Sequence, residues 1–183
     1  TTSLLKALIS NTSLNGNFML NIGPRADGTV PFEISQRMLE MGKWLDINGE
    51  SIYGAEAFDL DKDLHDWGKI TSKNDVESFK LFLHVFNWPL NKKLNLTGVN
   101  VNPKKIYLLS DKQKEPLQFL HSGAFTDIQL PVLQPDPYIS VIVVEYDKKP
   151  AIENGLVAKT VDGGFSLNPK NMNQKDKTIQ VVR

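Results

Sequence analysis

A single predicted strand between two predicted helices is the feature that most limits what this chain of 183 residues can fold into. The strand runs from Asn17 to Ile22 and is followed by Gly23-Pro24, which ends it because proline lacks the N–H group that a sheet needs. One strand of parallel type leaves hydrogen-bonding groups open on both of its edges. The front of the chain is therefore predicted to be part of a larger α/β structure.

The helices on either side of this strand are predicted at residues 3–10 and 31–48. Ser3 can cap the first helix, Pro31 suits the first turn of the second, and Asn48-Gly49 closes it. Each predicted helix carries one apolar stripe, whose residues recur at spacings of three and four. The stripes consist of Leu4, Leu5, Leu8 and Ile9 in the first helix, and of Ile34, Met38, Met41 and Leu45 in the second.

The rest of the chain has the pattern of an all-β domain. Short apolar runs, separated by turn residues at roughly ten-residue spacing, predict an antiparallel β-sandwich. The expected strands are 79–86, 94–96, 105–109, 117–120, 126–130 and 138–146, of which the last is the richest in β-branched residues. Residues 59–77 are charged and are expected to form a connector or a surface excursion. Residues 150–183 are a polar tail.

Composition excludes several classes of protein and of site. Lys plus Arg and Asp plus Glu both total 21, so the net charge is zero, and neither a nucleic-acid partner nor a polybasic membrane anchor is expected. No apolar run reaches the length of a membrane span, so no membrane insertion is expected. The chain has no cysteine, which removes disulfides, thiol catalysis and thiolate metal sites. It also lacks a signal peptide and an initiator methionine, so we expect a processed chain or a fragment.

Two patterns in the front part could indicate sites, a phosphate loop and a pair of catalytic carboxylates, but the residues present argue against both. Gly23 and Gly28 have the spacing of a phosphate loop, but Thr29 stands where the loop lysine should be. Glu33 and Glu40 share a helix face at about 10 Å along the axis. A retaining glycosidase pair needs about 5–5.5 Å, so a solvated helix face is the simpler interpretation.

The histidines and tryptophans give no site either. His65, His84 and His121 lack the spacing of metal ligands, and no metal or other cofactor is predicted. We expect His84 and Trp44 to be core residues. Trp88 could stack on a sugar, but packing is the simpler prediction.

Two stretches nevertheless resemble a known family. The first is residues 15–31, NGNFMLNIGPRADGTVP, together with MGKWL at 41–45 and NGESIYG at 48–54. It is similar to the end of the catalytic domain of α-L-fucosidases. The second is HVFNWP at 84–89, with YLL at 107–109 and the strand from Pro135 to Glu145. It is similar to the β-sandwich that follows that domain, so the resemblance covers roughly residues 3–147.

The resemblance implies a mostly β chain: an antiparallel β-sandwich preceded by the last strand and helix of a (β/α)8-like barrel. Residues 17–22 would be the eighth barrel strand. The implied domains are 1–55 for the terminal unit of a truncated barrel, 56–148 for the C-terminal β-sandwich and 149–183 for the polar tail, which resembles the start of a further module.

The resemblance also implies an activity for a longer parent protein. That parent would be a retaining glycosidase that releases α-linked L-fucose from glycans, in a periplasmic, secreted or lysosomal location. Its partners would be a fucosylated glycan and the rest of the catalytic barrel. The family's catalytic Asp and Glu lie upstream of the matched stretch, so this chain carries no catalytic residue and is expected to be inactive alone.

Asn21 and Arg25 are the candidate substrate-binding residues. Barrel enzymes react at the carboxyl ends of their strands. Alternation along the strand places Asn21 on the face opposite Leu20 and Ile22, pointing inward near the top, with Arg25 in the rim loop. We therefore hypothesise that both border the sugar pocket of the whole enzyme. In the alternative, Asn21 only satisfies backbone groups at the strand end, and Asp27-Gly28 only turns the chain.

Two other functions stay open from the sequence. A non-catalytic carbohydrate-binding or scaffolding module would show an exposed row of aromatic residues on one sandwich face. The mixed pattern of Phe79, Phe82 and Phe86 does not decide this from the sequence. A split enzyme, completed by a second chain, would show a large exposed apolar patch around Phe18, Leu20 and Ile22.

Overall fold

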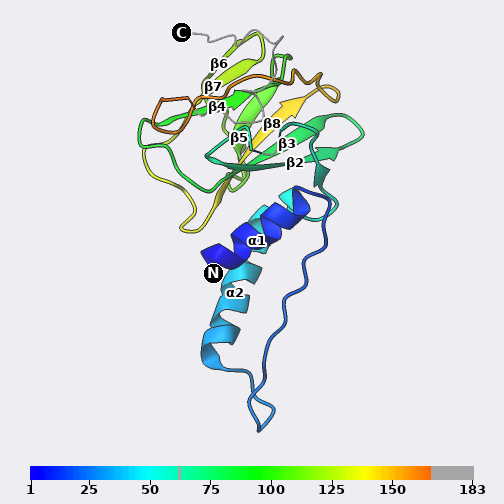
Figure 1. Ribbon diagram of the computed structural model, residues 1–183, viewed down its shortest axis with the longest axis vertical. Coiled ribbons are helices and arrows are strands. Elements are labelled where there is room, and N and C mark those ends of the chain that lie inside the picture. Colours follow the sequence, from blue (N-terminus) through cyan, green and yellow to red (C-terminus); the bar gives the residue numbers. More distant parts are fainter. Residues whose placement is uncertain (62, 166–183) are drawn as a thin grey trace.

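Residues 1–61 and 63–165 are described by a computed structural model, in which two helices and two β-sheets stack in layers (Figure 1). The helical elements are α1 (Thr2–Thr12), α2 (Phe32–Asn48) and the short 3-10 helix η1 (Gly49–Ser51). The strands are β1 (Glu56–Ala57), β2 (Gly68–Asn74), β3 (Phe79–Val85), β4 (Lys93–Thr97), β5 (Lys105–Leu108), β6 (Phe119–Ser122), β7 (Phe125–Gln129) and β8 (Ser140–Tyr146).

The strands form an antiparallel sandwich. Within the described ranges, one sheet has five strands in the order β1-β2-β3-β8-β5, and the other has three in the order β4-β7-β6. β3 and β8 lie at the centre of the larger sheet and pair along their whole length, from Phe79 opposite Tyr146 to Val85 opposite Ser140. The predicted β-sandwich is confirmed, and each of its expected strands overlaps an observed one.

Alternation along β3 separates two hydrophobic cores. Leu81 and Leu83 point into a core between the two sheets, where they join Leu94 of β4 and Ile128 of β7. Phe82, between them in sequence, points to the opposite face and packs among residues of α1 and α2. Successive side chains of a strand point to opposite faces, so a strand covered on both sides is apolar on both. This explains why both faces of β3 are apolar.

The helices form the third layer. Leu5 and Ile9 of α1 and Met41 and Trp44 of α2 pack with Phe82 against the five-stranded sheet. Trp44 also donates a hydrogen bond from Nε1 to the carbonyl oxygen of Ile139, at 2.8 Å. Trp44 and the buried His84 are therefore core residues, as predicted. None of the helices in the described ranges is long and apolar enough to cross a membrane.

The prediction that residues 59–77 form a connector or a surface excursion is wrong, because β2 lies inside this range and pairs with both β1 and β3. The sequence did not predict β2, because most of its side chains are polar and the prediction relied on apolar residues. Thr71 is fully buried, and its hydroxyl donates to the carbonyl oxygen of Ser51 at 2.8 Å. A buried hydroxyl that is hydrogen-bonded costs little, so a polar residue can occupy a buried strand position.

The predicted polar tail is described only as far as residue 165. Leu156, Val157 and Ala158 are buried there, and Ile152 packs against the core between the sheets. The remainder of that tail, from residue 166 onward, lies outside the described residues. The three predicted domain ranges remain a prediction.

Candidate functional site

The segment between α1 and α2 carries both candidate substrate-binding residues. Figure 1 shows that it runs away from the sheets along α2 and returns at a tip. The strand predicted from Asn17 to Ile22 does not form, because no strand of the described chain lies beside this segment to pair with it. The alternation that predicted the strand is present from Phe18 to Asn21 but ends at Ile22, which was expected on the same face as Leu20 and is 45% exposed. Phe18 and Leu20 are partly buried against the helix-layer core, whereas Met19 and Asn21 are exposed.

A tight turn at residues 25–29 forms the tip. The backbone N–H of Arg25 donates to the carbonyl oxygen of Thr29 at 2.8 Å, and that of Gly28 donates to Arg25 at 2.9 Å. Gly28 has φ +82°, a conformation that glycine adopts without strain. The Asp27 carboxylate accepts from the hydroxyl of Thr29 at 2.7 Å and from its N–H at 3.0 Å. These bonds to Thr29 lower the pKa of Asp27. Asp27-Gly28 therefore turns the chain.

Asn21 and Arg25 both have exposed side chains, four residues apart near this tip. Within the described residues, neither side chain makes a hydrogen bond or an ion pair. The alternative in which Asn21 satisfies backbone groups at a strand end thus has no counterpart in the described ranges. Their assignment to a sugar pocket remains a prediction.

The two weaker candidates in this part do not form sites. The N–H groups of Arg25, Gly28 and Thr29 are all used inside the turn and cannot cradle a phosphate. Glu40 accepts hydrogen bonds from Thr1 and Gln36, and these bonds lower its pKa. A carboxyl group with a lowered pKa is ionised at neutral pH and is a poor general acid. Within the described residues no His, Cys, Asp and Glu side chains cluster as metal ligands.

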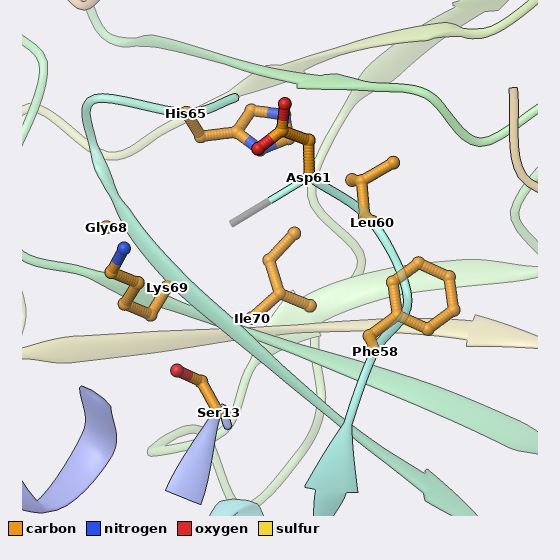
Figure 2. A pocket seen from close by; sticks show the side chains of 8 residues that line it. All are labelled: Ser13, Phe58, Leu60, Asp61, His65, Gly68, Lys69 and Ile70. Carbon is orange, nitrogen blue, oxygen red and sulfur yellow. The ribbon is translucent and has the colours of Figure 1, made fainter. Parts of the chain in front are cut away.

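A small hollow lies where the end of α1 meets the start of β2 (Figure 2). Ser13, Phe58, His65 and Ile70 are among the residues that line it. Its volume is about 20 Å³, which is enough for one water molecule and far too small for a sugar ring. A second hollow, of about 430 Å³, lies on the smaller sheet around Phe125 and Asp127, neither of which the sequence had marked as a candidate.

Two histidines next to β2 are buried and neutral. His65 is 7% exposed, and its Nε2 accepts a hydrogen bond from the N–H of Thr97 at 3.0 Å. His84 is fully buried, and its Nε2 lies 3.0 Å from the hydroxyl oxygen of Thr71. Because that hydroxyl donates to Ser51, His84 must donate from Nε2, and its buried Nδ1 has no hydrogen-bond partner among the described residues. Burial lowers the pKa of both histidines to about 3.

We expect these two histidines to make the fold sensitive to mild acid. In the unfolded chain the two histidines become protonated below their ordinary pKa of about 6.5. In the folded chain they stay neutral until the pH falls to about 3. The free energy of unfolding should therefore fall with decreasing pH through this window, by about 1 kcal/mol per pH unit for each histidine. Urea unfolding at pH 7.0, 6.0 and 5.0 measures the slope.

A matched pair of variants assigns that slope. His65→Gln should reduce it by about half, because one of the two buried imidazoles is gone. His121→Gln should change it little, since His121 is only partly buried. A slope that stays unchanged in His65→Gln would contradict the assignment.

Comparison with known proteins links the front of the chain to one family. The model of the α-L-fucosidase family matches residues 1–50, the part that contains α1, the tip and α2. The human tissue α-L-fucosidase is 34% identical over 107 residues, which is 58% of this chain and 22% of the relative. The α-L-fucosidase of Branchiostoma floridae is 36% identical over 130 residues, or 70% of this chain and 28% of the relative.

Solved structures extend the similarity across the sandwich. An α-L-fucosidase from a Vibrio species is 30% identical with a TM-score of 0.71, over 85% of this chain and 27% of its own. An α-L-fucosidase from Bacteroides thetaiotaomicron, solved as a trapped covalent intermediate, is 25% identical with a TM-score of 0.68 over 79% of this chain and 32% of its own. The resemblance to α-L-fucosidases predicted from the sequence is confirmed. The chain spans about a quarter of the curated relatives that it matches.

Proposed function

We propose that this chain is the C-terminal part of a glycoside hydrolase that releases α-linked L-fucose from glycans. One observation carries the proposal: the α-L-fucosidase family match coincides with a unit of α1, an extended segment and α2 that has no sheet of its own. The chain spans only 22–28% of its relatives, so the sheet that such a unit needs would come from the parent protein.

Exposed apolar side chains on this unit support the proposal. Met19 is 85% exposed, Phe32 is 70% exposed and Leu39 is 68% exposed. Large apolar side chains this exposed, on a unit without a sheet, are ones that another packed element would cover. These side chains belong to the extended segment and to the first half of α2, where the missing part of a barrel would lie. The patch anticipated for a split enzyme differs, since Phe18 and Leu20 are partly buried.

The reaction that we propose for the parent is a double displacement. One carboxylate attacks the anomeric carbon and breaks the glycosidic bond, while a carboxylic acid protonates the leaving oxygen. Water then hydrolyses the covalent glycosyl-enzyme with the second residue acting as a base. The trapped intermediate of the Bacteroides relative is the species that such a step forms. Both carboxylates would lie in the part of the parent that precedes this chain.

The role that we propose for this chain is to close and support that barrel. Trp44, Met41 and Leu5 hold the two helices on the five-stranded sheet, so the sandwich fixes the last helical unit in place. Nitrophenyl α-L-fucoside tests the proposal. The parent should release nitrophenol, and this chain alone should not. A parent without turnover would overturn the proposed activity, and turnover by this chain would overturn its supporting role.

In the complete parent we expect Asn21→Ala to lower kcat/KM for a fucoside by about tenfold, through the loss of one hydrogen bond to the sugar. The thermal midpoint should not change, because the Asn21 side chain is exposed. Asn102→Ala is the matched control, since Asn102 is an exposed asparagine on the sandwich. Unchanged kinetics in Asn21→Ala would remove this residue from the pocket.

A further inference from the structure

The hollow of about 430 Å³ lies on the outer face of the three-stranded sheet. Leu94, Leu96 and Ile128 of this sheet point inward to the core, so the residues that alternate with them face outward. Asp127 stands opposite Asn95 on one side and Leu120 on the other, and the three form a row across the outer face. Leu120, Phe125 and Asp127 line the hollow from the sheet side.

A short hairpin forms the opposite wall. Lys159 pairs with Phe165, and the N–H of Thr160 donates to the carbonyl oxygen of Gly164 at 2.9 Å. The N–H of Val161 donates to the Asp66 carboxylate at 3.0 Å, which attaches the hairpin to the loop before β2. The hollow is in this way bounded on two sides by elements that are hydrogen-bonded in place. A volume of several hundred Å³ is typical of sites for small molecules.

The polar groups of the hollow converge on Asp127. Its Oδ1 accepts a hydrogen bond from the Asn95 side chain at 2.7 Å, and its Oδ2 lies 3.8 Å from Nζ of Lys159. Neither charged side chain is buried, so each keeps hydrogen-bonding capacity toward the hollow. An acceptor and a donor side by side can bind hydroxyl groups, which both donate and accept.

The apolar groups are equally open. The ring of Phe165 is 46% exposed and the side chain of Leu120 is 71% exposed. An exposed ring beside hydrogen-bonding groups offers one apolar surface and one polar edge, as a pyranose does. Glu153 and Asp127 outnumber Lys159 among the charged lining residues, so the hollow disfavours anions.

We propose that this hollow binds a neutral sugar residue of a glycan. Asp127 and Lys159 would bind adjacent hydroxyl groups, and Phe165 and Leu120 would contact the apolar face of the ring. The expectation that the glycan is fucosylated rests on the function proposed above, but the chemistry of the hollow requires only a neutral sugar. Phe79, Phe82 and Phe86 do not form an exposed aromatic row, because Phe79 and Phe82 are buried on opposite faces of β3.

Titration of the full, isotopically labelled chain with sugars, followed by NMR, tests this proposal. The probes are L-fucose, D-galactose and N-acetylglucosamine, with the anionic N-acetylneuraminic acid as a comparison. We expect saturable shifts of the amides of Leu120, Phe125 and Lys159 with at least one neutral sugar, and weaker shifts with the anionic one. Because fucosidase activity is not measured, failure here is separate from failure of the proposed activity.

Variants locate the binding. Lys159→Met and Leu120→Ala should each weaken it by about tenfold, since each removes one contact with the sugar. Leu133→Ala is the matched control, because Leu133 is an exposed leucine that does not line the hollow. Absence of saturable shifts with all three neutral sugars, equal binding of the anionic sugar, or unchanged binding in both variants would overturn the proposal.

Discussion

Gly68→Ala is expected to prevent the normal pairing of β2 with β3. A Cβ atom on residue 68 would lie 1.8 Å from the carbonyl oxygen of His84 and 3.1 Å from the backbone nitrogen of Phe86. Both neighbours are backbone atoms of the paired region, so no side-chain rotation relieves the clash. Gly68 stands opposite Val85 in the register, and Phe86 bonds to Trp67 just beyond it. Adding atoms to a well-packed core usually costs about 1–3 kcal/mol, and here the clash is with backbone that cannot move aside. We therefore expect Gly68→Ala to lower the free energy of unfolding by more than about 3 kcal/mol.

Gly42→Ala is the matched control. Gly42 lies inside α2, and a Cβ atom there would meet nothing within 4 Å. Alanine in a helix interior is favoured over glycine by about 1 kcal/mol, so this variant should be neutral or more stable. Urea unfolding monitored by circular dichroism compares the two. If Gly68→Ala were as stable as the unmutated chain, the backbones of β2 and β3 would not approach each other as described.

The strands that the sequence predicted are those whose burial depends on apolar side chains. β3 and β8 are apolar on both faces because helices cover one side of their sheet and the second sheet covers the other. β2 escaped prediction because its buried position 71 is a threonine whose hydroxyl bonds to Ser51 and to His84. Those two partners are 20 and 13 residues away in the chain, so no local pattern could reveal them.

The strand predicted at 17–22 shows the opposite situation. Its alternation is present in the partial burial of Phe18 and Leu20 and the exposure of Met19 and Asn21, but it fails at Ile22, which is exposed. A strand is nevertheless defined by its neighbours, since its N–H and C=O groups need partners on an adjacent chain. The local sequence therefore predicts which side chains share a face, but it does not show whether another strand lies beside the segment to pair with it.

The candidate sites divide in the same way. Asn21 and Arg25 lie on one continuous segment, so their proximity followed from their spacing alone. The hollow around Asp127 joins strand β7 with Lys159, which is 32 residues further on. The ion pair between these two residues depends on the hairpin at 159–165 folding back over the sheet. No composition or periodicity in the sequence predicts that return.

Trp44→Ala should destabilise the whole described fold by about 3–5 kcal/mol, the usual cost of removing a buried aromatic side chain. Trp44 is 2% exposed and packs in the core between the helices and the five-stranded sheet. Its ring centre lies 6.5 Å from that of His84, a residue of β3. If the helices and the sandwich unfold together, removing the Trp44 side chain from α2 will also lower the stability of the three-stranded sheet.

Trp67 can report on that distant sheet. It is buried between the two sheets and donates from Nε1 to the carbonyl oxygen of Asn95 at 2.9 Å. Urea unfolding of Trp44→Ala should therefore show the same lowered midpoint in tryptophan fluorescence and in helical circular dichroism. Trp44→Phe, which keeps an aromatic ring but loses the bond to Ile139, should cost about 1–2 kcal/mol. A sandwich midpoint unchanged in Trp44→Ala would mean that residues 1–55 unfold as a separate unit, and the sandwich could not then support the barrel through this contact.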